Sequence, residues 1–119
     1  MQAEENALYS ISFFRDVDGT EPVKDYLENL KQKERDKAFV YIQMLSRNGP
    51  MLKRPYADNL GGGLGLWELR PGRHRILYFF YARRVIILCH AFLKKTDSIP
   101  EKEINIAIKR KDLVKRGCL

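Results

Sequence analysis

The sequence is poor in cysteine and lacks the motifs of a metal site. Its 119 residues contain two cysteines, Cys89 inside an apolar run and Cys118 next to the last residue. Two such cysteines form no disulfide framework, so we expect Cys89 to pack as a small hydrophobic side chain. There is no CxxC or HExxH motif, so no metal ion or other cofactor is expected. This cysteine usage favours the reducing cytoplasm.

Long apolar runs are also missing. The longest one, Ile76 to Ala82, has seven residues, whereas a membrane span needs roughly 20. The first six residues are acidic and polar, which is untypical of a secretory signal or an Arg-rich transit peptide. We therefore expect a cytoplasmic protein without a membrane partner.

Acidic residues are scarce in the middle of the chain. The formal net charge is +7, and residues 50–95 alone combine nine basic with two acidic residues, a net of +7. The segments before and after carry net charges of −2 and +2. An anionic partner such as nucleic acid should therefore meet the middle segment. Its basic residues are Lys53, Arg54, Arg70, Arg73, Arg75, Arg83, Arg84, Lys94 and Lys95.

Chain length and hydrophobic periodicity predict one small α+β domain over residues 1–119. Apolar types make up 45% of the sequence, enough for a packed core. Alternation predicts strands, and i, i+3, i+4 spacing predicts helices. Residues 51–63 are expected to form a loop. The predicted order is β-α-α-β-β-β-α, with strands at 8–14, 64–70, 73–81 and 85–95 in a small antiparallel sheet, and helices following Thr20, Lys33 and Ser98.

The helix boundaries follow from capping signals. Thr20 is expected to cap the first helix, and Ser98 to open the last one through capping-box spacing to Glu101. Asn48-Gly49-Pro50 is typical of a helix end. Four basic residues of the last helix are expected to be solvated: Lys102, Lys109, Arg110 and Lys111.

Arginines cluster around the turn between the second and third predicted strands. If Pro71-Gly72 is a two-residue turn, Arg70 lies opposite Arg73, and Glu68 lies opposite Arg75. One glutamate cannot neutralise three arginines, but a phosphate can bind guanidinium through two parallel hydrogen bonds. The ordinary alternative is a cross-strand ion pair between Glu68 and Arg75, with solvated arginines around it.

The last predicted strand brings further basic residues. Lys94 and Lys95 end that strand beside the start of the preceding one, so they can approach Arg73 and Arg75. His90 shares a face with Lys94 and could reach the cluster, although a lone strand histidine is more often structural. His74 is expected at the edge of the core. Four aromatic side chains are expected in the core and not as base-stacking platforms: Trp67, Phe79, Phe80 and Tyr81.

Linked motifs in this region resemble the RelE/ParE superfamily of toxins from type II toxin–antitoxin systems, in its HigB-like, phage-derived branch. The resemblance covers about residues 8–115 and implies the RelE-like toxin fold. It is carried by Leu66-Trp67-Glu68-Leu69-Arg70, Arg75-Ile76-Leu77-Tyr78, His90-Ala91-Phe92-Leu93-Lys94-Lys95-Thr96, Pro100 and Glu103-Ile104.

The resemblance implies a growth-inhibiting endoribonuclease that cuts messenger RNA on the ribosome without a metal. In relatives the 2′-hydroxyl attacks the neighbouring phosphate and the 5′-oxygen leaves. Arg70 and Arg75 match the arginines that clamp this phosphate, and Lys94-Lys95 the basic residues that stabilise charge or donate a proton. Arg73 and Lys53-Arg54 correspond to RNA contacts. The implied partner is a HigA-like helix-turn-helix antitoxin, which would also link the toxin to operator DNA.

One departure leaves the mechanism and the target open. Many relatives have a tyrosine or histidine near the chain's end as acid or base, but residues 96–100 contain neither. His90 is a possible acid–base substitute, as is a lysine whose pKa is lowered by cationic neighbours. Two alternatives remain: a ParE-like toxin that poisons DNA gyrase by binding, and a nucleic-acid-binding module without activity.

Overall fold

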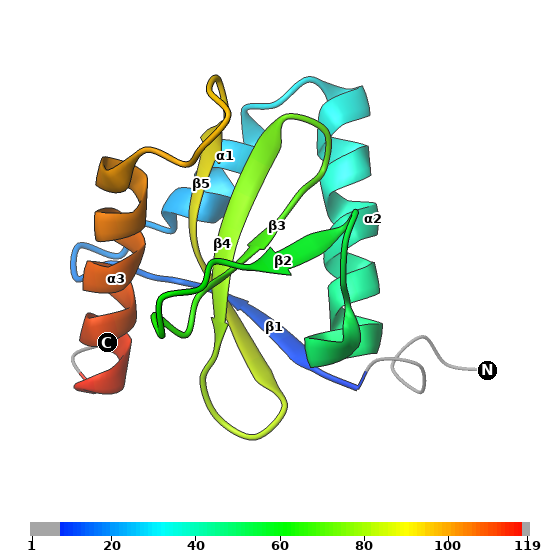
Figure 1. Ribbon diagram of the computed structural model, residues 1–119. Coiled ribbons are helices and arrows are strands. Elements are labelled where there is room, and N and C mark those ends of the chain that lie inside the picture. The colour runs from blue at the N-terminus through cyan, green and yellow to red at the C-terminus, as the bar shows by residue number, and fades with distance from the viewer. Residues whose placement is uncertain (1–7, 118–119) are drawn as a thin grey trace.

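The computed structural model describes residues 8–117 and shows one five-stranded sheet with helices on both faces (Figure 1). The strand order across the sheet is β1-β5-β4-β3-β2, with β1 parallel to β5 and all other neighbours antiparallel. Along the chain the elements are β1 (Ser10–Phe13), α1 (Pro22–Glu28), α2 (Gln32–Asn48), the 3₁₀ turn η2 (Gly49–Met51), β2 (Ala57–Asn59), β3 (Trp67–Leu69), β4 (His74–Phe80), β5 (Val85–Leu93) and α3 (Glu101–Lys115).

The predicted α+β class is confirmed, but two details of the sheet differ from the prediction. The first strand joins the sheet in parallel beside β5, so the sheet is mixed. A short strand, β2, occupies part of the predicted loop 51–63 and pairs with β3. Its three residues, Ala57-Asp58-Asn59, have low strand propensity and are too few to show alternation. Cys118 lies outside the described residues.

The two faces of β4 are buried against different helices. Ile76 and Tyr78 pack with residues of α1 and α2, whereas Leu77 and Phe79 pack with Ala107 of α3. Every side chain from His74 to Phe79 is buried, as expected of a central strand covered on both sides. Cys89 belongs to the core on the α3 face, as predicted, and burial raises the pKa of its thiol to about 12. In residues 8–117, no helix is long and apolar enough to cross a membrane.

Two predicted helix caps are wrong. Thr20 does not cap α1, because its hydroxyl donates to Asp18 Oδ1 at 2.7 Å and the helix begins after Glu21. That hydrogen bond lowers the pKa of Asp18. Pro100, not Ser98, precedes α3, and no side chain caps that helix. The predicted end of α2 is confirmed, because Gly49 follows Asn48 with φ 51° and ψ −130°, a conformation that favours glycine.

Gly49 also gives a direct test of the packing at the start of β1. A Cβ atom at this position would overlap the ring of Tyr9, so Gly49→Ala combines a clash with backbone strain. We expect Gly49→Ala to lower the free energy of unfolding by about 3 kcal/mol or more. Gly19→Ala is the control, since Gly19 has φ +88° but nothing within 4 Å, and should cost about 1 kcal/mol. Urea denaturation measures both; equal losses would contradict the predicted clash.

Candidate functional site

Pairing between β4 and β5 brings four basic residues to one end of the sheet. The backbone N–H of Lys94 donates to the carbonyl of Arg73 at 2.9 Å, and Arg75 pairs with Phe92. An open pocket of about 310 Å³ lies at this end, and we call it the basic pocket. The predicted approach of the lysines to the arginines is confirmed. The pocket is lined by Gly72, Arg73, Arg75, Lys94, Lys95, Thr96 and Asp97.

The connection between β3 and β4 is longer than predicted, which changes the register. Glu68 pairs with Leu77, not Arg75, and Leu69 pairs with Ile76. Continued by one residue, this register sets Arg70 opposite Arg75. The prediction of a two-residue turn at Pro71-Gly72, with Arg70 opposite Arg73 and Glu68 opposite Arg75, is therefore wrong. Two like charges now oppose each other, and Arg70 contributes to lowering the pKa of Arg75, although burial contributes more.

Arg75 is buried and contacts Glu68 and two backbone carbonyls. Its Nε lies 3.3 Å from Glu68 Oε1 in an ion pair without a hydrogen bond, and the two side chains are only 9% and 10% exposed. Its Nη1 donates to the carbonyls of Gly72 and His74, both at 2.8 Å. The expected Glu68–Arg75 ion pair is thus confirmed, as a buried diagonal pair. Nη2 has no hydrogen-bond partner among the described residues, so its two N–H groups are available to a ligand in the basic pocket.

His74 lies on the other face of the sheet and joins two helices. The hydroxyl of Tyr26 in α1 lies 2.6 Å from Nδ1, and a carboxylate oxygen of Glu34 in α2 lies 2.5 Å from Nε2. The predicted role at the edge of the core is confirmed. Because His74 precedes Arg75, these contacts also fix the start of β4 at the basic pocket.

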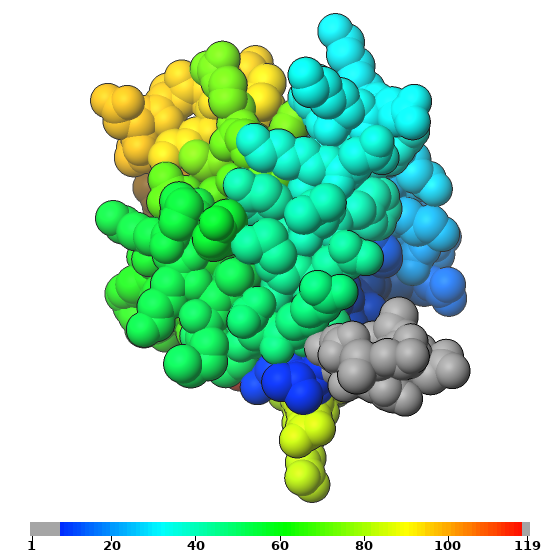
Figure 2. All heavy atoms as spheres, turned by 90° about the vertical axis from the view of Figure 1, so that its right-hand side faces the viewer, coloured from blue at the N-terminus to red at the C-terminus, as the bar shows by residue number. Residues whose placement is uncertain are grey.

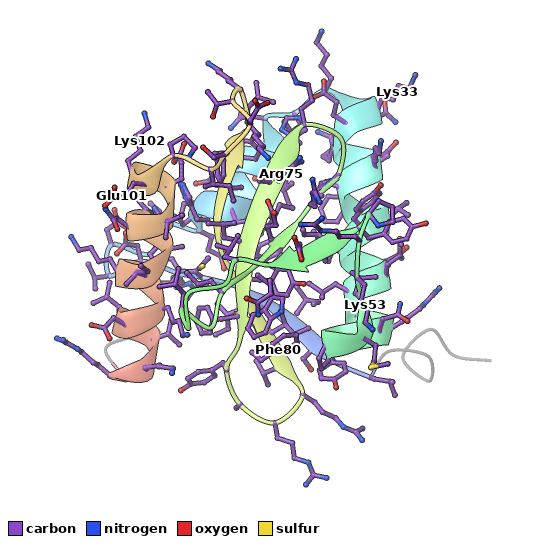
Figure 3. The ribbon with its side chains drawn as sticks, in the orientation of Figure 1. Lys33, Lys53, Arg75, Phe80, Glu101 and Lys102 are labelled. Carbon is purple, nitrogen blue, oxygen red and sulfur yellow. The ribbon has the colours of Figure 1, made fainter. Side chains whose placement is uncertain are left out.

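The loop pair Lys53-Arg54 lies outside the basic pocket. Both residues line a neighbouring pocket of about 390 Å³ near β2, and Figure 3 shows Lys53 well away from Arg75. Arg54 is bound to Asp58, with Nη2 2.6 Å and Nε 2.8 Å from the same carboxylate oxygen. Arg54 contributes most to lowering the pKa of Asp58, and Arg70 adds to it. Arg70 itself is not among the residues that line either pocket.

His90 is also absent from the basic pocket, because α3 binds it. Its Nε2 lies 2.8 Å from Glu103 Oε1, and Arg110 Nη1 lies 3.2 Å from its Nδ1. Burial lowers the pKa of His90, and Arg110 lowers it further, whereas Glu103 opposes the shift. The geometry fits a neutral ring that accepts from Arg110 and donates to Glu103.

The expected solvated face of α3 is therefore wrong for two of its basic residues. Arg110 also donates to the carbonyl of Cys89 at 2.8 Å, at the irregularity where β5 has one more residue than β4. Lys111 Nζ donates to the carbonyls of Leu64 and Gly65 at 2.7 and 3.1 Å. These hydrogen bonds hold α3 against the sheet.

Asp97 is a candidate that the sequence pattern did not indicate. It is exposed and contributes the carboxylate among the residues that line the basic pocket. The only signal in the sequence was its position just after Lys94-Lys95. In residues 8–117, no three His, Cys, Asp or Glu side chains are grouped so that they could hold a metal ion. Lys94, Lys95 and Asp97 are the groups in the basic pocket that can transfer protons.

The buried ion pair gives the first prediction for the site. Glu68→Ala leaves Arg75 charged and buried without its carboxylate, so we expect a loss of about 3 kcal/mol in unfolding free energy. Asp112→Ala is the matched control, because its pair with Arg116 is 59% and 70% exposed and should change stability by less than about 1 kcal/mol. Urea denaturation measures both. A Glu68→Ala loss no larger than that of the control would show that Arg75 does not depend on Glu68.

His90 gives the second prediction, through pH. Its folded-state pKa is lowered, so below the unfolded-state value of about 6.5 the unfolded chain takes up a proton that the folded protein resists. Stability should therefore fall as the pH drops from 7 through 6.5 toward the folded-state pKa. In His90→Gln this contribution is absent, so the loss of stability on acidification should be smaller than in the wild type. Urea denaturation of both proteins at pH 7 and at pH 5.5 measures this loss. If the wild type and His90→Gln lose the same unfolding free energy between the two pH values, the effect is excluded.

Comparison with known proteins adds one finding. The family model described as "Phage derived protein Gp49-like (DUF891)" matches residues 25–112, roughly three quarters of the chain. The matched part contains every residue that lines the basic pocket. No curated protein matches the chain.

Proposed function

The chain belongs to the phage-derived Gp49-like family, part of the RelE-like toxins of type II toxin–antitoxin systems. We propose that it is a ribosome-dependent, metal-independent endoribonuclease that cuts messenger RNA. The observation that carries the proposal is the basic pocket, where Arg73, Arg75, Lys94 and Lys95 converge. Cleavage by the 2′-hydroxyl adds negative charge to the phosphate in the transition state. Fixed positive groups stabilise that charge.

Arg75 has the geometry of a phosphate clamp. Glu68 and two backbone carbonyls hold its guanidinium in place, so little reorganisation is needed when the phosphate arrives. Nη2 remains to bind a phosphate oxygen. Arg70, opposite Arg75 in the strand register, adds a second positive charge beside the clamp.

Proton transfer falls to groups at the end of β5. In the proposed reaction the carboxylate of Asp97 accepts the proton of the 2′-hydroxyl, and the 2′-oxygen forms a bond to phosphorus. The bond from phosphorus to the 5′-oxygen breaks, and Lys94 or Lys95 donates a proton to that leaving oxygen. The products are a 2′,3′-cyclic phosphate and a 5′-hydroxyl. His90 takes no part, since it is held by Glu103 and Arg110.

The proposed partners follow from the same function. The ribosome presents the messenger RNA, and a small helix-turn-helix antitoxin encoded alongside silences the toxin and links it to operator DNA. Acidic segments of the antitoxin would meet the same positive charge as the RNA. Co-purification of the chain with the product of a neighbouring gene is the check on this partner, and a chain that binds no such product contradicts it.

A gyrase-poisoning toxin of the same fold is the second candidate. One observation favours it: no histidine or tyrosine is among the residues that line the basic pocket, and inhibition by binding needs no proton-transfer group. The two candidates predict different damage in cells, cleaved transcripts in the first case and broken DNA in the second.

The test of the proposed function removes one charge at a time. Lys94→Ala and Arg70→Ala should each slow the cleavage of messenger RNA on purified translating ribosomes about 100-fold, because each removes a group that stabilises the transition state. Lys115→Ala is the control: it removes the same charge from an exposed position on α3 and should cut at the wild-type rate. Both slow variants should fold, bind the antitoxin and permit growth. Full activity in both would overturn the site assignment.

A further inference from the structure

The turn between β4 and β5 carries basic residues far from the basic pocket. Residues 81–84 connect Phe80 to Val85, and all four are exposed. The turn projects from the body of the protein, as the yellow-green tip in Figure 2 shows. We call it the β4–β5 tip. Tyr81, expected in the core, is 47% exposed there, so that expectation is wrong.

Arg84 occupies a backbone conformation that the chain otherwise reserves for glycine. All eight glycines have positive φ, and Arg84, at φ 58°, is the one other such residue within 8–117. A side chain with a Cβ is strained in this region, so arginine costs conformational free energy that glycine would not. Such strain at an exposed turn points to a use for the side chain itself.

The tip presents its charge on a fixed backbone. The carbonyl of Arg84 accepts a hydrogen bond from Ser10 N in β1 at 2.7 Å, and Tyr81 N donates to Val85 O at 2.9 Å. Arg83 and Arg84 form no ion pair among the described residues. Two unpaired guanidinium groups beside an exposed aromatic ring suit phosphates and the flat face of a base.

The tip and the basic pocket lie at opposite ends of the same two strands. Arg75 is near one end of β4 and Phe80 is at the other (Figure 3). At about 3.3 Å per residue, the eight steps from Arg75 to Arg83 separate the two regions by roughly 25 Å. A partner that touches both must be extended or large, and it must be anionic at both points.

We propose that the β4–β5 tip is a second RNA-binding contact, which docks the protein on a large folded RNA of the ribosome while the basic pocket holds the phosphate to be cut. The inference rests on the proposed function and deepens it, since it separates the docking charge from the cleaving charge. Tyr81 supplies a stacking surface, and Arg83 and Arg84 bind phosphates.

The experiment compares binding of the full chain to purified ribosomes without messenger RNA and to a short single-stranded RNA. In Arg83→Ala/Arg84→Gly, affinity for ribosomes should fall at least tenfold. The log–log salt slope should lose about 1.4 to 1.8, at roughly 0.7 to 0.9 for each phosphate contact. A short RNA cannot span the roughly 25 Å between the tip and the basic pocket, so its affinity should fall far less than the affinity for ribosomes. Arg83→Lys/Arg84→Lys keeps the charge and should retain most of the ribosome affinity.

Thermal melting guards against misfolding, because Arg84→Gly relieves the strain and should not lower the Tm. Unchanged ribosome affinity in the Ala/Gly variant overturns the inference, as does an equal loss on the short RNA or a loss confined to antitoxin binding. Failure of the proposed function shows separately: a wild-type chain that leaves messenger RNA intact refutes cleavage, whereas tip-dependent ribosome binding is measured without any cleavage.

Discussion

The pairing of β4 with β5 is the constraint on which the rest of the structure depends. It runs from His74 opposite Leu93 to Phe80 opposite Ile86. Its side chains form both halves of the core, since one face packs on α1 and α2 and the other on α3. The same pairing places Arg73 beside Lys94 at one end of the two strands and the β4–β5 tip at the other end. Stability and the placement of charge thus come from one set of backbone hydrogen bonds.

The positive charge at the basic pocket destabilises the folded protein when no ligand is bound, and the same charge favours binding of an anion. Burial lowers the pKa of Arg75, and Arg70 lowers it further, so the environment of Arg75 disfavours its charge. Glu68 offsets part of this cost. A bound phosphate would compensate this unfavourable positive charge. The excess of positive charge that destabilises the free protein therefore favours the binding of an anionic ligand.

Local patterns were enough for the α+β class, the helical stripes and the convergence of Arg73 with Lys94, because each depends on periodicity or on strand direction. Long-range geometry was not accessible in this way. β2 exists because β3 is there to pair with it, and a connection two residues longer than expected moved Glu68 from Arg75 to Leu77. The extra residue at Cys89 and the bonds from Arg110 commit His90 to α3, and Asp97 reaches the pocket through a bend after the last strand.

Mapping the ends of transcripts in cells after brief induction of the chain tests the central claim most directly. If the basic pocket cuts messenger RNA by attack of the 2′-hydroxyl, new 5′-hydroxyl ends should accumulate within translated regions. They should be absent when Lys94→Ala is induced to the same level. Growth arrest with intact transcripts, or with broken DNA in their place, would contradict the account and identify the target as something other than messenger RNA.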